Sequence, residues 1–137
     1  MSENLSFLQD RFRTVYAVYR RLQDDLSKAV HAQAKLQARM DEIEIVQEQI
    51  EHLSPSSLMY KEVGSSLVEF SAADVRRNIL RRLEHLRLEM ELVERRLADL
   101  SEKTENRKIE ILQLEKKITR ASRRSFHVHF SPSAVAS

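Results

Sequence analysis

Histidine is the residue type in this sequence whose chemistry is easiest to recognise, and five are present. His127 and His129 are separated by one residue, and such a pair supplies at most two ligands to a metal ion. The other histidines have no carboxylate cluster at ligand spacing beside them, so no metal site is predicted. There is no cysteine, and no nucleophile lies in a recognisable pattern with a base. The sequence therefore predicts a protein that is not an enzyme and binds no cofactor.

Because Gly64 is the single glycine of the sequence, glycine-rich phosphate-binding loops and folds with many left-handed turns are excluded. Phosphate-binding loops need several glycines, and sandwiches, barrels and doubly wound sheets need them at left-handed turns. The 137 residues are 32% charged and 42% hydrophobic, with two prolines and no tryptophan. This composition is typical of long helices or a coiled coil.

Basic residues gather between Arg107 and Arg124, where the acids are Glu110 and Glu115. A cationic helix end could attract acidic client segments or a partner surface. It could equally be a solvated helix C-terminus, where cations complement the helix dipole, and we favour this simpler interpretation. The net charge of +2 is too balanced to predict a nucleic-acid partner. No apolar stretch approaches the roughly 20 residues of a membrane span, so no membrane partner is predicted.

A first heptad seam predicts a helix over residues 5–53. Ser54 and Pro55 end it, because proline disfavours a helical residue before it and cannot continue the hydrogen-bond ladder. Val46 and Leu53 lie beside the seam and suggest that its phase drifts near the end of the helix. The seam positions are apolar except Gln33 and Gln47: Leu5, Leu8, Phe12, Val15, Tyr19, Leu22, Leu26, Ala29, Gln33, Leu36, Met40, Ile43, Gln47 and Ile50.

A second seam predicts a helix over residues 72–121, with Ser71 as its N-cap and Asp74 in its first turn. Thr104 and Arg107 interrupt this seam; Arg107 could stack on Tyr19, but we expect the seam to loosen there. Two arms of equal length around a short break predict a mainly α fold, a long antiparallel two-helix coiled coil within one domain, residues 1–121. The seam comprises Ile79, Leu83, Leu86, Met90, Val93, Leu97, Leu100, Thr104, Arg107, Ile111, Leu114, Ile118 and Ala121.

Residues 58–70, between the arms, predict a β-hairpin. Two runs rich in Tyr, Val, Leu and Phe flank Gly64, which supplies the positive φ that a hairpin turn needs. Leu67, Val68 and Phe70 place apolar groups on both faces of the second strand. A lone two-stranded hairpin is marginal in water, and its edges favour pairing with further strands. The midpoint of the chain therefore predicts an assembly site.

The segment Tyr60–Val68, Tyr-Lys-Glu-Val-Gly-Ser-Ser-Leu-Val, is similar to the hairpin signature Tyr/Phe-Lys-x-x-Gly-x-x-Leu-Val of β-class prefoldin subunits. Residues 22–28 and 45–48 resemble the first helix of that family, and residues 82–86 resemble the opening of its second helix. The resemblance spans about residues 5–118. Ser65 and Ser66 depart from it, because the family often has Pro and Val there, and Ser66 is expected to weaken one strand contact.

The resemblance implies a hetero-hexamer of two α-class and four β-class prefoldin subunits whose hairpins join in a β-barrel base. Helix ends would then hold unfolded proteins, notably actin and tubulin chains, and pass them to the cytosolic chaperonin without ATP use. The expected localisation is cytoplasmic. The expected assembly residues are Tyr60, Val63, Gly64, Leu67, Val68 and Phe70. The expected client-binding tip comprises Leu5, Leu8, Phe12, Ile111, Leu114 and Ile118, although each of these could merely close the coiled coil.

Three alternatives stay open beside this interpretation. A self-associating coiled-coil scaffold is the first, although a scaffold's turn has no need for apolar strands. A basic arm that grips nucleic acid is the second, and the acids interspersed along both helices count against it. A prefoldin-like subunit of a nuclear or transcription-linked complex is the third. Residues 122–137, rich in Ser and Arg, are expected to form a disordered tail.

Overall fold

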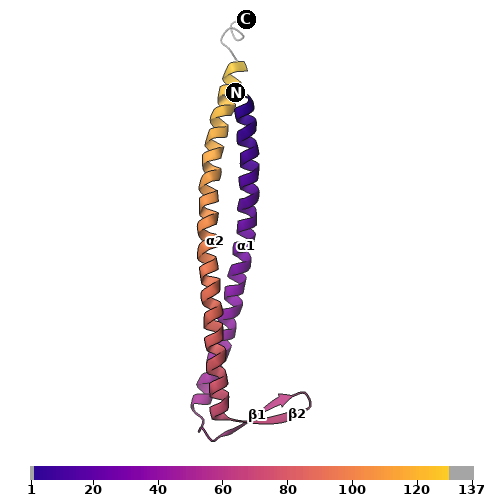
Figure 1. The fold of residues 1–137 in the computed structure, drawn as a ribbon, viewed down its shortest axis with the longest axis vertical. Coiled ribbons are helices and arrows are strands. Elements are labelled where there is room, and N and C mark those ends of the chain that lie inside the picture. Colours follow the sequence, from indigo (N-terminus) through magenta and orange to yellow (C-terminus); the bar gives the residue numbers. More distant parts are fainter. Residues whose placement is uncertain (1, 130–137) are drawn as a thin grey trace. The chain divides into compact units, whose positions relative to one another are not determined.

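The computed structural model describes the backbone of residues 2–129 and the side chains of residues 4–124. Its elements follow the order α1 (Ser2–Glu51), β1 (Leu58–Val63), β2 (Ser66–Ser71) and α2 (Ala72–His129) (Figure 1). The two long helices and the antiparallel hairpin confirm the predicted fold class. Internal contacts divide the chain into two units. We call the helix segments up to Lys28 and from Ala98 onward the terminal unit, and Ala29–Leu97 the hairpin unit.

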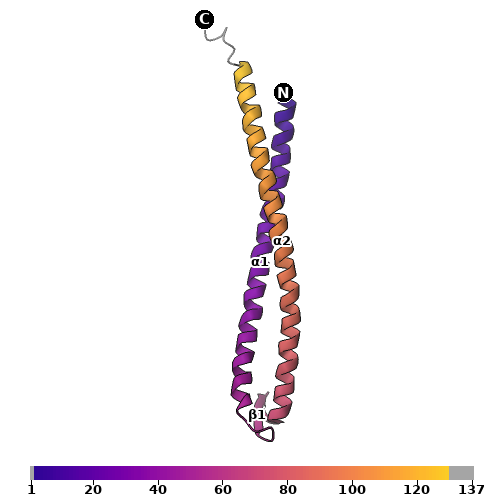
Figure 2. The ribbon, with the colours of Figure 1, turned by 90° about the vertical axis from the view of Figure 1, so that its left-hand side faces the viewer.

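Within each unit, a segment of α1 lies antiparallel to a segment of α2 (Figure 1, Figure 2). In the terminal unit, Val15, Ile111 and Leu114 form a buried cluster. The hairpin unit has two clusters. Leu36, Leu86 and Met90 form one, and Ile50, Ile79 and Leu83 form the other. Every seam position predicted from the sequence is buried or half-buried, because a heptad spacing returns a side chain to the same face of a helix after two turns.

The ends of the helices differ in detail from the sequence predictions. Helix α1 ends at Glu51 rather than at residue 53, and Val46 and Leu53 are exposed, so the expected drift of the seam toward them is wrong. Helix α2 continues to His129, past residue 121, where a disordered tail was expected to begin. The segment after residue 121 contains no proline before Pro132, so nothing in its covalent chemistry stops the helix earlier. Residues 130–137 of the expected tail lie outside the described residues.

The start of α2 has the predicted cap. The backbone N–H of Asp74 donates to the Ser71 hydroxyl oxygen over 3.2 Å, which satisfies one of the unpaired donors of the first helical turn. A side-chain hydrogen bond from Ser71, and then the contact with Arg77, hold the pKa of the Asp74 carboxyl below its ordinary value. Ser71 therefore marks the junction where strand β2 becomes helix α2.

Arg76 on α2 caps the end of α1, a contact that spacing alone does not reveal. One guanidinium nitrogen, Nη2, donates to the backbone carbonyls of Ile50, Glu51 and Leu53 over 2.8, 3.2 and 2.6 Å. Carbonyls at the C-terminal end of a helix lack partners from a following turn, and here the Ile50 carbonyl accepts one further hydrogen bond, from the backbone N–H of Leu53 over 2.9 Å. A charged donor on three helix-end carbonyls also complements the negative end of the helix dipole. Arg76 therefore stabilises the junction from which the hairpin leaves the helices, beside the backbone hydrogen bond from the Ala72 N–H to the Ser57 carbonyl over 2.9 Å.

Arg76→Ala is expected to lower the free energy of unfolding by about 1.5–3 kcal/mol, because hydrogen bonds from a charged group are lost and helix-end carbonyls lose their partner. The measurement is urea unfolding followed by circular dichroism. Arg77→Ala is the matched control, since Arg77 contacts only the exposed Asp74 one turn away and its loss is expected to change stability by less than about 0.5 kcal/mol. Equal losses in the two variants would contradict the capping role.

Candidate functional site

The hairpin is an antiparallel ribbon of two strands. Its register pairs Leu58 with Ser71 at the open end and Val63 with Ser66 at the turn. Gly64 has a φ of 63°, and no other described residue has a positive φ, which fits a type II′ turn at Gly64-Ser65. Because the sheet has two strands within residues 2–129, each strand has one edge without a partner strand among the described residues. Ser66 lies inside the ladder, so the departure from the family signature at this position does not prevent pairing within the hairpin.

Apolar side chains occupy both faces of this ribbon, as the sequence predicted. Side chains alternate between the faces along a strand, and directly paired residues share a face. One face carries Leu58, Tyr60 and Leu67, with Glu62 and Glu69 among them; the other carries Met59, Val63, Val68 and Phe70, with Lys61 among them.

Nearly all of these side chains are open to solvent. Leu67 is 72% exposed and Tyr60 is 63% exposed. Among the strand side chains, Met59 is the one that packs against the helix core, beside Ile50, Ile79 and Leu83. Apolar groups on both faces and unpaired edges together make the hairpin a surface that is incomplete in the single chain.

The six residues expected at the client-binding tip all belong to the terminal unit, but they are not equally accessible. Ile111 and Leu114 are buried with Val15, and Leu8 and Phe12 pack against this cluster. Leu5 and Ile118 are half-buried. These side chains close the helix pair in this structure, and they would meet a partner fully only where the two helices separate.

Exposed apolar residues of the terminal unit were missed by the sequence analysis. Phe7 is 69% exposed, and Tyr16, Ile109 and Leu112 are also exposed. The ring of Tyr16 stacks on that of Phe12, with centroids 6.0 Å apart and planes 10° apart. A search for heptad seams selects inward positions only. These exposed residues could have been predicted from the sequence, because they are large apolar residues at positions outside the seam.

The helices of the terminal unit stay packed at Thr104 and Arg107, the two polar residues that interrupt the second seam. The Thr104 hydroxyl donates to the backbone carbonyl of Leu100 over 2.6 Å, so its polar group is satisfied within the helix. Arg107 is half-buried and donates from Nη1 to Oε2 of Glu110 over 2.9 Å. Ile111 and Leu114, which follow, are buried. The predicted loosening at Thr104 and Arg107 is therefore wrong, because local polar partners satisfy both side chains.

Glu110 joins the two helices of the terminal unit. Its Oε1 accepts from Nη2 of Arg11 on α1 over 2.7 Å, while its Oε2 accepts from Arg107 on α2. The hydrogen bond from Arg11 is the largest cause that holds the pKa of the Glu110 carboxyl below its usual value of 4.5; burial opposes it, and the hydrogen bond from Arg107 adds a smaller lowering. The ion pair between Arg11 and Glu110 thus links α1 and α2 next to the cluster around Val15.

Because the folded-state pKa of Glu110 is lowered, the contact stabilises the terminal unit above the usual pKa of 4.5 and is lost as the pH falls below it. Glu110→Gln is expected to reduce the free energy of unfolding at pH 7 by about 1 kcal/mol or less, since the pair is partly exposed. At about pH 3 the difference from the unaltered chain is expected to shrink toward zero. Urea unfolding at the two pH values measures this. Glu105→Gln, at an exposed position on the same helix, is the control, and a difference that persists unchanged at low pH would contradict the account.

The hairpin and the terminal unit expose apolar side chains, which suit binding to other proteins. Within residues 2–129, neither helix has an apolar stretch long enough to cross a membrane. No group of three or more potential metal ligands is present in the described part of the chain, and the side chains of His127 and His129 lie outside it. What the described residues offer is an uncovered apolar hairpin and a helix-end region with exposed apolar groups.

Comparison with known proteins decides the family. The sequence profile of the family described as "Prefoldin subunit" matches residues 13–120, which is most of the chain. The chain belongs to this family. Membership in the prefoldin family implies a co-chaperone role and assembly with other prefoldin subunits. It is also consistent with the prediction that the chain is not an enzyme.

Individual prefoldin proteins support the assignment. Prefoldin subunit 6 of Bos taurus is 30% identical over 114 residues, which cover 83% of this chain and 88% of that protein. Prefoldin subunit 6 of Saccharomyces cerevisiae is 30% identical over 98 residues, covering 72% and 86%. The prefoldin beta subunit of Thermococcus strain KS-1 matches in fold, with a TM-score of 0.71, 21% identity, and coverage of 75% of this chain and 90% of that one. The fold of this chain is thus similar to that of the Thermococcus prefoldin beta subunit.

Proposed function

We propose that this chain is a β-class subunit of a hetero-hexameric prefoldin that captures unfolded proteins and delivers them to the cytosolic chaperonin without ATP use. Actin-type and tubulin-type chains are the proposed clients, and the cytoplasm is the proposed location. The observation that carries the proposal is the uncovered hairpin. Apart from Met59, its apolar residues are exposed in the single chain, yet they are what a barrel of shared strands requires.

The assembly surface of this proposal comprises the six hairpin residues Tyr60, Val63, Gly64, Leu67, Val68 and Phe70. Burying one large apolar side chain contributes roughly 1.5–3 kcal/mol, so several together supply the free energy for stable association. One hairpin per chain suits a β-class subunit, which contributes a single hairpin to the base. The second strand of the hairpin and the edges of both strands are open to neighbours.

The client-binding surface of this proposal is the terminal unit. It comprises the six expected residues, Leu5, Leu8, Phe12, Ile111, Leu114 and Ile118, and the exposed Phe7 and Leu112 beside them. Many weak apolar contacts suit a protein that must bind diverse unfolded chains and release them again. No nucleotide is needed for such binding, because capture and release follow from apolar contact alone.

A tagged pull-down from the native cell, followed by native mass spectrometry, tests the proposal. A species of hexamer size that contains this chain and five other small helix–hairpin–helix chains is expected. Actin, tubulin or chaperonin subunits in smaller amounts would support the proposed clients and recipient. A homodimer without such partners would instead support a self-associating coiled-coil scaffold. Nuclear transcription proteins among the partners would support the nuclear prefoldin-like complex.

A further inference from the structure

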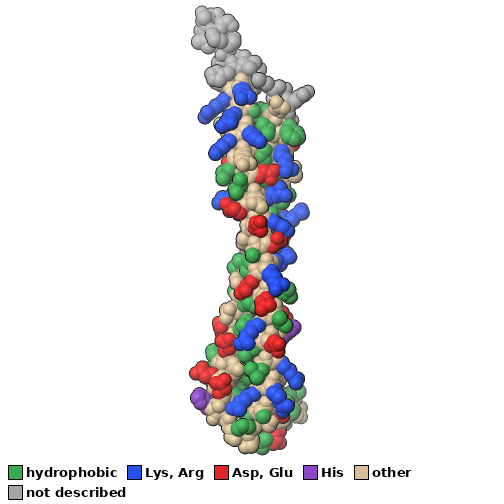
Figure 3. All heavy atoms as spheres, turned by 60° about the vertical axis from the view of Figure 1, so that its left-hand side comes forward, with side chains coloured by type: hydrophobic (Ala, Val, Ile, Leu, Met, Phe, Trp, Pro, Cys, Tyr) green, Lys and Arg blue, Asp and Glu red, His purple; other side chains and the backbone are tan. Residues whose placement is uncertain are grey.

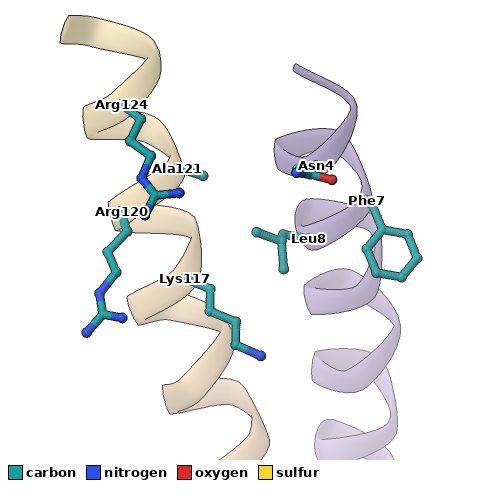
Figure 4. Close-up of a pocket in the computed structure, with 7 residues that line it drawn as sticks. All are labelled: Asn4, Phe7, Leu8, Lys117, Arg120, Ala121 and Arg124. Atoms are coloured by element: carbon teal, nitrogen blue, oxygen red, sulfur yellow. The ribbon is translucent and has the colours of Figure 1, made fainter. Parts of the chain in front are cut away.

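A groove of about 330 Å³ opens between the helix ends of the terminal unit. Figure 4 shows Leu8 of α1 and Ala121 of α2 pointing toward each other across it, with Lys117 reaching over from α2. Phe7 and Arg120 lie at its outer margins (Figure 4). The complete lining is Asn4, Phe7, Leu8, Lys117, Arg120, Ala121 and Arg124. The groove therefore combines an aliphatic floor with cationic walls.

The charge of this groove is of one sign only. Lys117, Arg120 and Arg124 contribute three cations, and no carboxylate lines it. Among the ion pairs of residues 4–124, none involves these three residues. Figure 3 shows Lys and Arg side chains gathered at this end of the terminal unit.

Like charges also stack along α2 here. Arg120 and Arg124 are four residues apart, as are Lys116 and Arg120, so each pair lies on one face of the helix. Like-charged pairs at this spacing destabilise a helix by a few tenths of a kcal/mol, whereas an anion between them would reverse the sign of the interaction. Lys116 and Arg123 line an adjoining groove on α2, where Glu115 is also present, so the surface of one sign is confined to the groove of Lys117, Arg120 and Arg124. The free helix end is thus arranged for an anionic partner.

We propose that this groove binds segments of unfolded chains in which an apolar side chain is flanked by carboxylates, an inference that rests on the proposed client-holding function. The apolar side chain would lie on Leu8 and Ala121, with its flanking carboxylates at Lys117 and Arg124. An aliphatic floor recognises a peptide side chain and offers nothing to a sugar–phosphate backbone. The groove therefore adds a charge preference to a surface that would otherwise select for apolarity alone.

Fluorescence anisotropy on the full-length chain with three short labelled peptides tests this. The first has a central Phe flanked by Asp, the second has Lys in place of Asp, and the third has Ser in place of Phe. The first is expected to bind about tenfold more tightly than the second, because two exposed charge contacts turn from attractive to repulsive. This preference is expected to weaken with added salt, since exposed charges are screened.

Lys117→Glu with Arg124→Glu is expected to abolish the preference for the acidic peptide. Arg20→Glu with Arg21→Glu, at exposed positions of the terminal unit outside the groove lining, makes the same change in net charge and is expected to preserve it. Retention of the preference in the Lys117→Glu, Arg124→Glu chain would overturn the proposal. So would equal binding of the peptide that lacks Phe, or of a single-stranded oligonucleotide, because either would indicate a general polyanion surface.

A parallel assay separates this inference from the proposed function. The assembled complex with the Arg20→Glu, Arg21→Glu chain, whose changes lie outside the groove lining, is expected to suppress aggregation of a client of low net charge as well as the unaltered complex does. If the unaltered complex fails to suppress aggregation, the proposed function fails, and the peptide preference is still decided by the anisotropy measurement. If suppression is normal but the peptide preference is absent, only the charge selectivity fails.

Discussion

Leu67→Asp is expected to exclude the chain from the assembled prefoldin complex and to leave the free chain folded. Leu67 is 72% exposed in the single chain, so the new carboxylate meets water there and changes folding little. In an assembly that covers this face of the hairpin, the same carboxylate would be buried without a partner, which costs several kcal/mol. Co-expression with the partner subunits, followed by size-exclusion chromatography and circular dichroism, measures both effects.

Ser65→Asp is the matched control for this experiment. It adds the same charge two residues away, in the turn between β1 and β2 rather than on a face of the ribbon. The control chain is expected to enter the complex. A Leu67→Asp chain that assembles as efficiently as the Ser65→Asp chain would remove the hairpin faces from the proposed interface.

Leu8→Ser with Phe12→Ser is expected to weaken client capture by about tenfold or more without dissociating the complex, because two large apolar contacts are removed from the proposed tip. Both side chains pack against the buried cluster of Val15, Ile111 and Leu114, far in sequence from the hairpin. The measurement is suppression of client aggregation at increasing concentrations of the complex, with assembly checked by native mass spectrometry.

Leu88→Ser with Leu92→Ser is the control, because it removes two exposed leucines from the hairpin unit instead. It is expected to leave client capture nearly unchanged. Phe7→Ser with Leu112→Ser adds a further comparison, because both residues are exposed while the two helices are packed together. If this variant alone loses client capture, clients bind the outer surface of the packed helices. Normal suppression of aggregation by the assembled Leu8→Ser, Phe12→Ser complex would remove these two residues from the proposed tip.

Much of the fold could be predicted from the sequence, because the relevant signals are local. A heptad spacing specifies which side chains meet, and the seam residues are buried or half-buried accordingly. Ser71 specifies a helix start through a hydrogen bond that spans three residues. Gly64 specifies the hairpin turn, because a positive φ is easy only for glycine. Each of these rules depends on neighbours within a few residues along the chain.

The candidate site was predicted less completely. The hairpin residues stand out in sequence, since apolar groups alternate onto both faces of a short ribbon, and most of them are exposed in the described part of the chain. Which tip residues are accessible could not be read from spacing, because it depends on how closely the two helices pack. Ile111 and Leu114 are buried by residues nearly a hundred positions away, whereas Phe7 and Leu112 face solvent.

The two seams and the capped start of α2 follow from periodicity and backbone chemistry, so the sequence alone was enough to predict them. The contacts of long polar side chains could be seen only once the helices were packed together. Arg76 caps the end of α1, and Glu110 accepts from Arg11 across the helix pair. The partners of a long flexible side chain depend on which groups lie near it in space, and the distances between helices are set by how they pack.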